Sequence, residues 1–151
     1  EEINAKMDCE IEFKLGAVLE TPRAALKAND LSVKCDFLSF GTNDLTQMTY
    51  GLSRDDAGRF MTNYIEKDVF PNDPFHSLDL EGVGELILIA VDRARKSDQS
   101  TELGLCGEHG GDPDSIKFCL EAGFNYVSCS PFRIPIARLA AAQASILRKK
   151  I

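Results

Sequence analysis

The stretch Leu38-Ser-Phe-Gly-Thr-Asn-Asp-Leu-Thr-Gln-Met48 joins a short apolar run to a polar turn and then to a segment typical of the first turns of a helix. This order predicts a strand that runs directly into a helix. Backbone N–H groups at such a junction point outward and suit a phosphate or carboxylate group. Asp44, beside them, could hold a divalent cation through a hard oxygen. The alternative is an ordinary turn in which Asp44 or Thr42 caps the helix.

The alternation of strand and helix continues on both sides of this stretch. Thr21 and Pro22, for example, suit the N-cap and first position of a helix that follows a short apolar run. Strands that alternate with helices predict an α/β fold with a parallel sheet. The expected strands are 15–19, 33–40, 102–106 and 124–129, and the expected helices include 21–30, 80–96, 116–122 and one that begins at 135.

Four strand–helix units predict one of two architectures. The first is a small open α/β sheet. The second is the second half of a (β/α)8 TIM-type barrel, since eight units usually need about 250 residues. Residues 1–151 would then be one partial domain. Residues 51–79, rich in polar side chains and with two prolines and two glycines, are expected to form a loop of functional length or an inserted subdomain.

Composition and charge exclude several classes of protein. Of the 151 residues, 44% are hydrophobic and 27% charged, as in a folded globular protein. The net charge is −7, from 24 acidic and 17 basic side chains, and no basic stripe is present, so we expect no nucleic-acid partner. The longest apolar run, Leu86 to Val91, is too short to cross a bilayer, and the first residues are acidic. We expect no membrane partner and a cytoplasmic location, with an organellar location of a parent enzyme left open.

The cysteines indicate a reducing compartment. Five of them, at positions 9, 35, 106, 119 and 129, form no C-x-x-C pair, and the sequence has two histidines, His76 and His109. This spacing predicts neither a zinc site nor a disulfide framework.

Chemically useful side chains follow the ends of the four predicted strands, at Glu20, Asp44, Cys106 and the turn at Ser130. In a parallel sheet these side chains would point into one pocket at the carboxyl edge. Two carboxylates that share a cation with substrate oxygens are typical of Mg²⁺, which would stabilise an enolate as a Lewis acid. The Cys106 thiol could give or take a proton at carbon. The alternative for Cys106 is a buried strand cysteine, the commonest fate of a free cysteine.

Three long motifs resemble the C-terminal region of the pyruvate, phosphate dikinase family, and the likeness runs from about Gly16 to the end. They are FGTNDLTQMTYGLSRDDAG at 40–58, CGEHGG at 106–111 and YVSCSPFRIPIARLAAAQ at 126–143. Phosphoenolpyruvate synthase and enzyme I of the bacterial sugar phosphotransferase system share the Asn-Asp-Leu-Thr-Gln core and remain alternatives. The HGG continuation at 109–111 and the SCSPFR run at 128–133 favour the dikinase.

The resemblance implies a fold, a reaction and site residues. The region would be the second half of a (β/α)8 barrel that binds pyruvate or phosphoenolpyruvate. Glu20 and Asp44 would hold Mg²⁺, Gly41, Thr42 and Asn43 would line the substrate with them, and Cys106 would be the proton donor to the methylene carbon. The family converts ATP, pyruvate and phosphate into AMP, phosphoenolpyruvate and pyrophosphate through a phosphohistidine on another domain of the same chain.

The resemblance leaves some points open. Arg54 either binds phosphate, as an arginine at this distance does in enzyme I, or pairs with a neighbouring acid. His109 is expected to shape the loop around Cys106 rather than to carry phosphate. The nucleotide and phosphohistidine domains and the first half barrel are not among the 151 residues, so we expect no full reaction from this chain alone. A homodimer is expected from the family, and a non-catalytic half-barrel dimerisation module is the alternative function.

Overall fold

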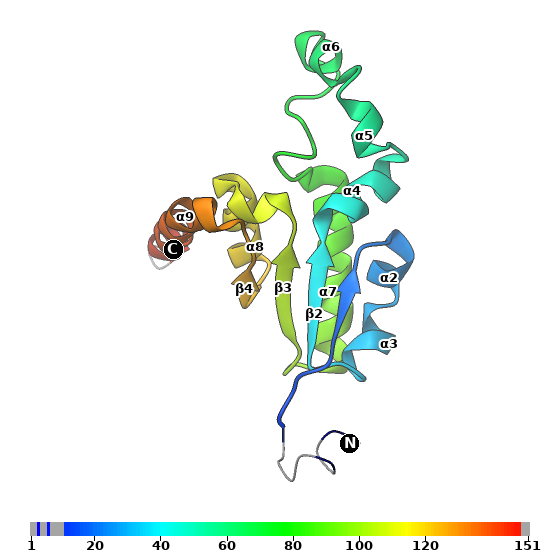
Figure 1. The fold of residues 1–151 in the computed structure, drawn as a ribbon, viewed down its shortest axis with the longest axis vertical. Coiled ribbons are helices and arrows are strands. Elements are labelled where there is room, and N and C mark those ends of the chain that lie inside the picture. The colour runs from blue at the N-terminus through cyan, green and yellow to red at the C-terminus, as the bar shows by residue number, and fades with distance from the viewer. Residues whose placement is uncertain (1–2, 4–5, 7–10, 149–151) are drawn as a thin grey trace.

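The structure is a computed structural model that describes residues 3, 6 and 11–148, and its centre is a four-stranded parallel sheet (Figure 1). The strands are β1 (Gly16–Leu19), β2 (Phe37–Gly41), β3 (Glu102–Cys106) and β4 (Tyr126–Val127). The helices are α2 (Pro22–Leu26), α3 (Ala28–Ser32), α4 (Thr42–Tyr50), α5 (Arg54–Ala57), α6 (Met61–Glu66), the π-helix η1 (Leu80–Gly84), α7 (Glu85–Ser97), the 3-10 turn η2 (Glu108–Gly111), α8 (Pro113–Glu121), the 3-10 turn η3 (Pro131–Arg133) and α9 (Ile134–Arg148). The predicted α/β class is confirmed.

The strand order β1-β2-β3-β4 follows the order of the chain. A doubly wound open sheet reverses its order at a switch point, whereas consecutive strands of a barrel do not. The helices α2, α3 and α7 lie together on one face of the sheet (Figure 1). Both features are consistent with half of an α/β barrel, as predicted.

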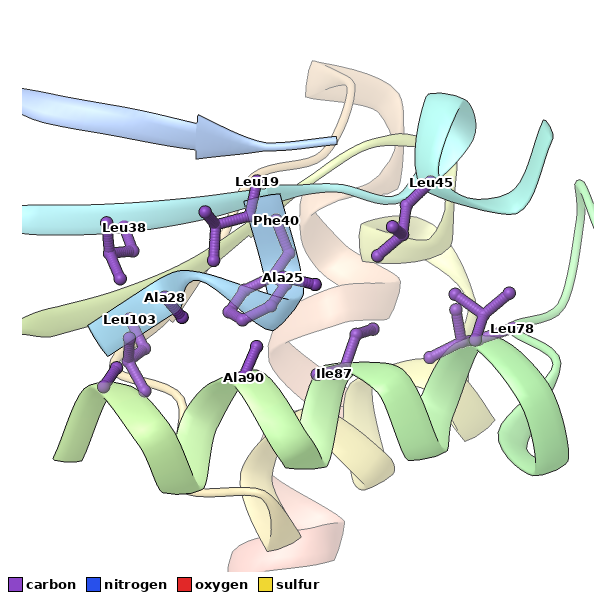
Figure 2. Packing of buried hydrophobic residues seen from close by; sticks show 12 residues of the cluster. Leu19, Ala25, Ala28, Leu38, Phe40, Leu45, Leu78, Ile87, Ala90 and Leu103 are labelled. Carbon is purple, nitrogen blue, oxygen red and sulfur yellow. The ribbon is translucent and has the colours of Figure 1, made fainter. Parts of the chain in front are cut away.

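The hydrophobic core lies between the sheet and these helices (Figure 2). Leu19, Leu38, Phe40 and Leu103 point toward this layer, because alternate side chains of a strand face the same side. They pack against α7, where Ile87, Ala90 and Ala94 are fully buried. Burial of such large side chains contributes about 1.5–3 kcal/mol each.

The opposite face of the sheet has no helix drawn over it (Figure 1). Val18, Ser39, Gly104 and Tyr126 are register partners across the four strands and share this face. Val18 is 50% exposed. The ring of Tyr126 lies across Gly104, where a Cβ atom would come within 2.0 Å of it. This face corresponds to the interior of the proposed barrel.

One predicted helix start is confirmed, and another lies earlier than predicted. The Thr21 hydroxyl accepts a hydrogen bond from the Ala24 N–H at 3.2 Å, and Pro22 opens α2. The Asp112 carboxylate accepts from the Ser115 N–H at 3.0 Å and opens α8, which begins at 113, earlier than predicted.

Several predicted elements have different limits in the structure. The strand expected over 33–40 is β2, which begins at Phe37, and the helix expected over 80–96 is the π-helix η1 followed by α7. The helix expected over 21–30 is two short helices, α2 and α3, which meet at Lys27. The strand expected over 124–129 is the two-residue β4, because it pairs on one side only and its ladder ends with the bonds from Asn125 N–H to Leu103 O and from Ser128 N–H to Leu105 O.

Residues 51–79, predicted as a loop or insertion, project from the carboxyl end of the sheet (Figure 1). They contain α5 and α6 and have a small apolar cluster of their own, made by Ala57, Met61 and Phe75. We refer to residues 51–79 as the excursion.

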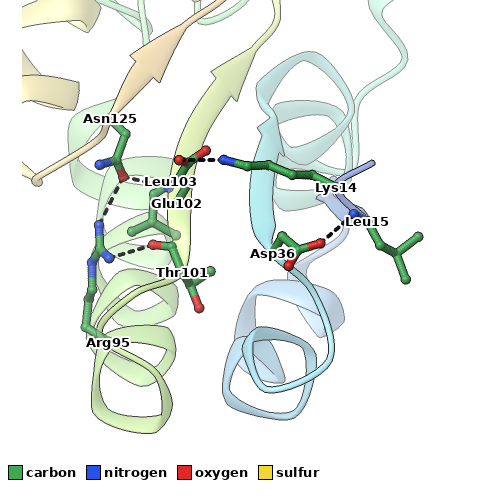
Figure 3. Close-up of polar contacts among 8 residues, drawn as sticks. All are labelled: Lys14, Leu15, Asp36, Arg95, Thr101, Glu102, Leu103 and Asn125. Carbon is green, nitrogen blue, oxygen red and sulfur yellow. Dashed lines mark hydrogen bonds and ion pairs between the residues drawn. The ribbon is translucent and has the colours of Figure 1, made fainter. Parts of the chain in front are cut away.

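Polar contacts hold the opposite, amino-terminal end of the sheet (Figure 3). Arg95 donates to the Thr101 carbonyl and, at 3.1 Å, to the Asn125 side-chain oxygen, which also accepts the Leu103 N–H at 2.8 Å. Lys14 pairs with Glu102 at 2.8 Å. These contacts join α7, β3 and β4 at the end that carries none of the predicted site residues.

Candidate active site

The strand register brings three predicted site residues together at the carboxyl edge of the sheet. Gly41 pairs with Cys106 in the β2–β3 ladder. Leu19 pairs with Phe40, so Glu20 follows beside Gly41. Because side chains alternate, Glu20, Gly41 and Cys106 belong to the open face of the sheet.

Gly41 leaves the space that the Glu20 side chain uses. A Cβ atom at Gly41 would lie 2.9 Å from Glu20 Cβ, 3.0 Å from Val18 Cγ1 and 3.1 Å from Glu20 Oε2. Real Cβ atoms rarely have such close neighbours. The missing side chain therefore allows the Glu20 carboxylate to lie over the junction between β2 and α4.

The helix α4 begins directly after Gly41, and no side chain caps it. The N–H groups of its first turn therefore have no side-chain partner, an arrangement that is typical of anion-binding helix starts. The Thr42 hydroxyl is fully buried and contacts the ring of His109. Because the whole residue is buried, Thr42 supports the start of α4 from inside the protein and offers no exposed group to a ligand in this conformation.

The side-chain orientation of Asn43 follows from its partner. Its Oδ1 atom lies 3.1 Å from the Glu108 backbone nitrogen, which can only donate. The amide NH₂ group must then face away from Glu108. Asn43 lines the neighbouring cavity, so this NH₂ group is a donor available to a ligand.

Gly107 allows the loop after Cys106 to touch the start of α4. Its φ of 149° is a conformation that residues with a side chain rarely adopt. A Cβ atom there would also lie 2.5 Å from Thr42 Oγ1. The chain after Cys106 therefore passes against the helix start without a side chain between them.

His109 fixes this loop from inside the protein. It is fully buried, with Nε2 at 2.9 Å from the Pro74 carbonyl oxygen and Nδ1 at 2.8 Å from Thr42 Oγ1. The carbonyl can only accept, so Nε2 carries the proton and Nδ1 accepts from the Thr42 hydroxyl. Burial lowers the pKa of His109 below its ordinary 6.5. Both nitrogens are engaged, which excludes His109 as a phosphohistidine in this conformation.

Asp44 lies in the first turn of α4, with an exposed side chain. Its Oδ1 atom accepts from Gln47 Nε2 at 2.9 Å, and Gln47 Oε1 accepts from the Arg54 N–H at 2.7 Å. Arg54 forms an ion pair with Glu108. The hydrogen bond from Arg54 lowers the pKa of the Glu108 carboxyl below its ordinary value. Arg54 was expected either to bind phosphate or to pair with a neighbouring acid. In the structure it pairs with an acid, but this is Glu108 and not a residue next to it in the sequence.

A cavity of about 500 Å³ adjoins these residues. The excursion, the loop after Cys106 and the end of β4 all contribute to its wall. Its lining residues are Asn43, His76, Gly107, Glu108, Gly111, Asp112, Ser128, Cys129, Ser130 and Arg133. The turn at Ser130 therefore lies at the same edge as the predicted site residues. The sequence patterns indicated no role for His76, which lies in the excursion, or for Arg133, which follows the end of β4.

The thiols differ in their surroundings. Cys35, Cys106, Cys119 and Cys129 are free, and Cys9 lies outside the described residues. Burial raises the pKa of Cys119 to about 12, which makes it an inert core residue. Cys106 is half-buried at the carboxyl edge, so the alternative of a wholly buried strand cysteine does not describe it.

Glu20 and Asp44 fit a Mg²⁺ ion in their chemistry. Both supply hard oxygens, and among the described residues neither takes part in an ion pair. The same part of the chain contains no group of three His, Cys, Asp or Glu side chains that could hold a metal. Two carboxylates are still sufficient for Mg²⁺, which usually keeps water and substrate oxygens as its other ligands.

No helix within the described residues is long and apolar enough to cross a membrane. This agrees with the absence of long apolar runs in the sequence.

Comparison with known proteins gives a consistent result. Residues 1–146 match the family described as "PEP-utilising enzyme, PEP-binding domain". The chain is 56% identical over 150 residues to a Rhizobium meliloti protein named "Pyruvate, phosphate dikinase", and 50% identical over 149 residues to a Clostridium symbiosum protein of the same name. It is also 53% identical over 146 residues to "Pyruvate, phosphate dikinase 2" of Oryza sativa. These matches cover 97–99% of the chain but only 16–17% of the relatives.

Proposed function

The chain belongs to the PEP-utilising enzymes, through their PEP-binding domain, and on that premise we propose that it binds phosphoenolpyruvate and pyruvate at the carboxyl edge of its sheet. The strand register carries this proposal, because it places Glu20 beside Gly41 and Gly41 beside Cys106. The Glu20 carboxylate, the uncapped start of α4 and the Cys106 thiol thereby lie at one edge of the sheet. A cation and a helix start suit the carboxylate and phosphoryl oxygens of phosphoenolpyruvate, and a thiol suits proton transfer at its methylene carbon.

The complete reaction that we propose is that of pyruvate, phosphate dikinase. ATP, pyruvate and phosphate are converted into AMP, phosphoenolpyruvate and pyrophosphate, with a phosphohistidine on another domain of the same chain as the phosphoryl carrier. The dikinase names of relatives at 50–56% identity support this choice. Phosphoenolpyruvate synthase and phosphotransferase enzyme I are the alternatives within the family.

Each residue has a proposed role in the step at pyruvate. Glu20 and Asp44 hold a Mg²⁺ ion, whose Lewis acidity lowers the energy of enolate charge. The first N–H groups of α4 and the Asn43 amide bind substrate oxygens. The Cys106 thiolate removes a proton from the methyl carbon of pyruvate, and the enolate oxygen then takes the phosphoryl group from the phosphohistidine. In the reverse direction, the histidine takes the phosphoryl group and the Cys106 thiol returns the proton to the methylene carbon.

A chimera tests the proposal with the whole chain in a complete enzyme. This chain replaces the segment that it matches in the Rhizobium meliloti relative, and phosphoenolpyruvate formation is measured. Replacement of Cys106 by Ala should lower kcat by about 10²- to 10⁴-fold and abolish deuterium exchange into the methyl group of pyruvate. Cys35→Ala is the matched control, since Cys35 is also half-buried but lies away from the carboxyl edge. Equal exchange in the two variants would contradict the role of Cys106.

The isolated chain answers a narrower question. Oxalate, a planar mimic of the pyruvate enolate, is titrated into it with and without Mg²⁺. Binding that needs Mg²⁺ and is lost in Asp44→Ala would show that Asp44 belongs to a metal site within this half barrel. No binding by a folded sample would show that the other strands complete the site.

We also propose that the chain takes part in a homodimer. The helix α9 supports this, because Leu139, Ile146 and Leu147 on it are 61%, 57% and 55% exposed. Sedimentation of the chimera should give a dimer that Leu139→Arg weakens. A dimer without turnover would favour the alternative of a non-catalytic dimerisation module. The free thiols support a reducing compartment, which we propose is the cytoplasm or, as the names of some plant relatives indicate, a chloroplast.

A further inference from the structure

A closed ring of side-chain contacts surrounds the start of α4. It runs from Asp44 to Gln47, from Gln47 to the Arg54 backbone, through the Arg54 guanidinium to Glu108, and from the Glu108 backbone to Asn43, which precedes Asp44 in the chain. Three separate segments meet in it: α4, the first residues of the excursion, and the loop after Cys106. The proposed function gives a task to Asp44 and Asn43 but none to Gln47, Arg54 or Glu108.

The orientation of the Gln47 amide in this ring is determined by its partners. The Arg54 backbone N–H can only donate, so the oxygen of the amide must face it, at 2.7 Å. The NH₂ group then faces Asp44 Oδ1, at 2.9 Å, and a carboxylate accepts there. The flipped amide would set two donors against each other at one end and two acceptors at the other. Gln47 therefore has one orientation, and so does the carboxylate that it contacts.

This arrangement goes beyond an ordinary surface pair. Residues at i and i+3 on a helix often form a hydrogen bond worth only a few tenths of a kcal/mol. Here the second end of Gln47 is bound to a residue seven positions further along, which begins α5 and has no side-chain cap from Ser53. The Gln47 side chain thus fills the place of a missing helix cap. Its position depends on the excursion as well as on α4.

The ion pair between Arg54 and Glu108 extends the coupling to the thiol loop. Glu108 lies two residues after Cys106, and its backbone N–H is bound to Asn43 at 3.1 Å. A shift of Arg54 would therefore move both the Gln47 side chain, which contacts Asp44, and the loop that follows Cys106. Ligands of a metal are commonly oriented by partners of this kind, and loss of such a partner typically costs 10- to 100-fold in metal affinity.

We propose that Gln47 is a positioning residue, which holds the Asp44 carboxylate in the orientation that a cation requires. The Arg54–Glu108 ion pair connects Gln47 to the loop after Cys106. One oxygen of Asp44 is engaged by Gln47, and the other is left for the metal. Through Arg54, the excursion thereby connects Asp44, the proposed metal ligand, to the loop that follows Cys106. The inference rests on the proposed function, because it assigns Asp44 to the metal.

The test measures Mn²⁺ affinity in the presence of oxalate, by electron paramagnetic resonance, in the Rhizobium meliloti chimera. Gln47→Met keeps the length of the side chain and removes both hydrogen bonds. We expect it to raise the Mn²⁺ dissociation constant about tenfold or more. Unfolding by urea is followed in parallel, so that a folded variant with weak metal binding is distinguished from an unfolded one.

Charge reversal tests the Arg54–Glu108 ion pair. Arg54→Glu should raise the Mn²⁺ dissociation constant by about threefold or more, and the double variant with Glu108→Arg should restore most of the affinity, since the ion pair is rebuilt in the opposite sense. Arg59→Glu is the matched control, because Arg59 pairs with Asp56 at 3.6 Å in the same excursion, is 83% exposed and lies outside the ring. It should leave Mn²⁺ affinity unchanged.

The outcomes separate this inference from the proposed function. A parent chimera that binds no Mn²⁺ with oxalate overturns both. A parent chimera that binds, with a folded Gln47→Met variant whose dissociation constant is within about twofold of the parent value, overturns the role of Gln47 alone. Loss in Arg54→Glu without recovery in the double variant overturns the role of the Arg54–Glu108 ion pair. Formation of the phosphohistidine from ATP, which the proposed scheme assigns to other domains, should be the same in all variants.

Discussion

Gly107 and Thr42 touch across the candidate site, so that a single Cβ atom at position 107 would lie 2.5 Å from Thr42 Oγ1. This contact joins the loop that follows Cys106 to the start of α4, where the substrate is proposed to bind. The Thr42 hydroxyl also donates to His109, which continues the contact to Pro74 in the excursion. The loop, the helix and the excursion are therefore packed as one unit.

The substitution Gly107→Ala should push the loop after Cys106 away from the start of α4. The added methyl group collides with Thr42, and the backbone φ of 149° is unfavourable for alanine. We expect a loss of about 1–3 kcal/mol in the free energy of unfolding, measured with urea, and a fall in kcat of the chimera. Gly58→Ala is the control, because a Cβ there meets no atom within 4 Å and its φ is −56°. Equal stability of the two variants would contradict the close contact.

His109 predicts how stability changes with pH. Burial lowers its pKa in the folded protein, whereas the unfolded chain has the ordinary value of 6.5. The unfolded state then binds more protons below that value, so the free energy of unfolding should fall as the pH is lowered through 6.5 toward the depressed folded pKa. Asp112 and Glu108 act in the opposite direction on this histidine and His76 acts in the same one.

The measurement compares the chain with His109→Gln by urea unfolding between pH 7.5 and pH 5.5. The variant should be less stable at pH 7.5, because a buried hydrogen-bonded ring is lost, and should show a smaller decrease toward acid pH. Parallel curves for the two proteins would mean that His109 titrates alike in the folded and unfolded states.

Much of the fold and part of the site follow from local sequence patterns. Strands 102–106 and 16–19 are apolar runs that end at polar turns, and Thr21 and Asp112 mark helix starts through short-range hydrogen bonds. The placement of Glu20, Gly41 and Cys106 at one edge follows from parallel pairing alone.

The contacts that join distant segments could not be predicted in this way. His109 meets Pro74 and Thr42, and Arg54 meets Glu108, across 35 to 67 positions of sequence. Such pairs leave no periodic signal, because they depend on how the excursion and the loop after Cys106 fold back on the start of α4. Local patterns therefore indicate the residues proposed to contact the ligand, but they do not indicate Gln47, which is proposed to orient Asp44.

Asn125 should contribute to stability without affecting the proposed chemistry. Its side-chain oxygen accepts from the Leu103 N–H at 2.8 Å and from Arg95 at 3.1 Å, at the amino-terminal end of the sheet (Figure 3). Asn125→Ala leaves a buried N–H without its partner and should cost about 1–3 kcal/mol. Lys96→Met, which removes an exposed pair with Asp92, should cost less than about 0.5 kcal/mol. Both are measured by urea unfolding, and kcat of the folded chimera should be unchanged. A fall in kcat for Asn125→Ala would place it in the site.

Gly41→Ala should weaken the proposed metal site through Glu20. The new Cβ would lie 2.9 Å from Glu20 Cβ and 3.1 Å from its Oε2, so the carboxylate must move. We expect Mn²⁺ affinity with oxalate in the chimera to fall about tenfold, as for other displaced ligands, and the free energy of unfolding to change less than in Gly107→Ala.

A second substitution distinguishes displacement of Glu20 from crowding at Val18. The same Cβ lies 3.0 Å from Val18 Cγ1, so Val18→Ala would relieve that contact and leave the collision with Glu20 in place. The double variant with Val18→Ala should therefore remain weak in Mn²⁺ binding. If it regains the parent affinity, crowding at Val18 rather than displacement of Glu20 is the cause, and Glu20 loses its support as a metal ligand. If Mn²⁺ affinity stays low in the double variant while its urea unfolding is normal, the absence of a side chain at position 41 is required for metal binding through Glu20.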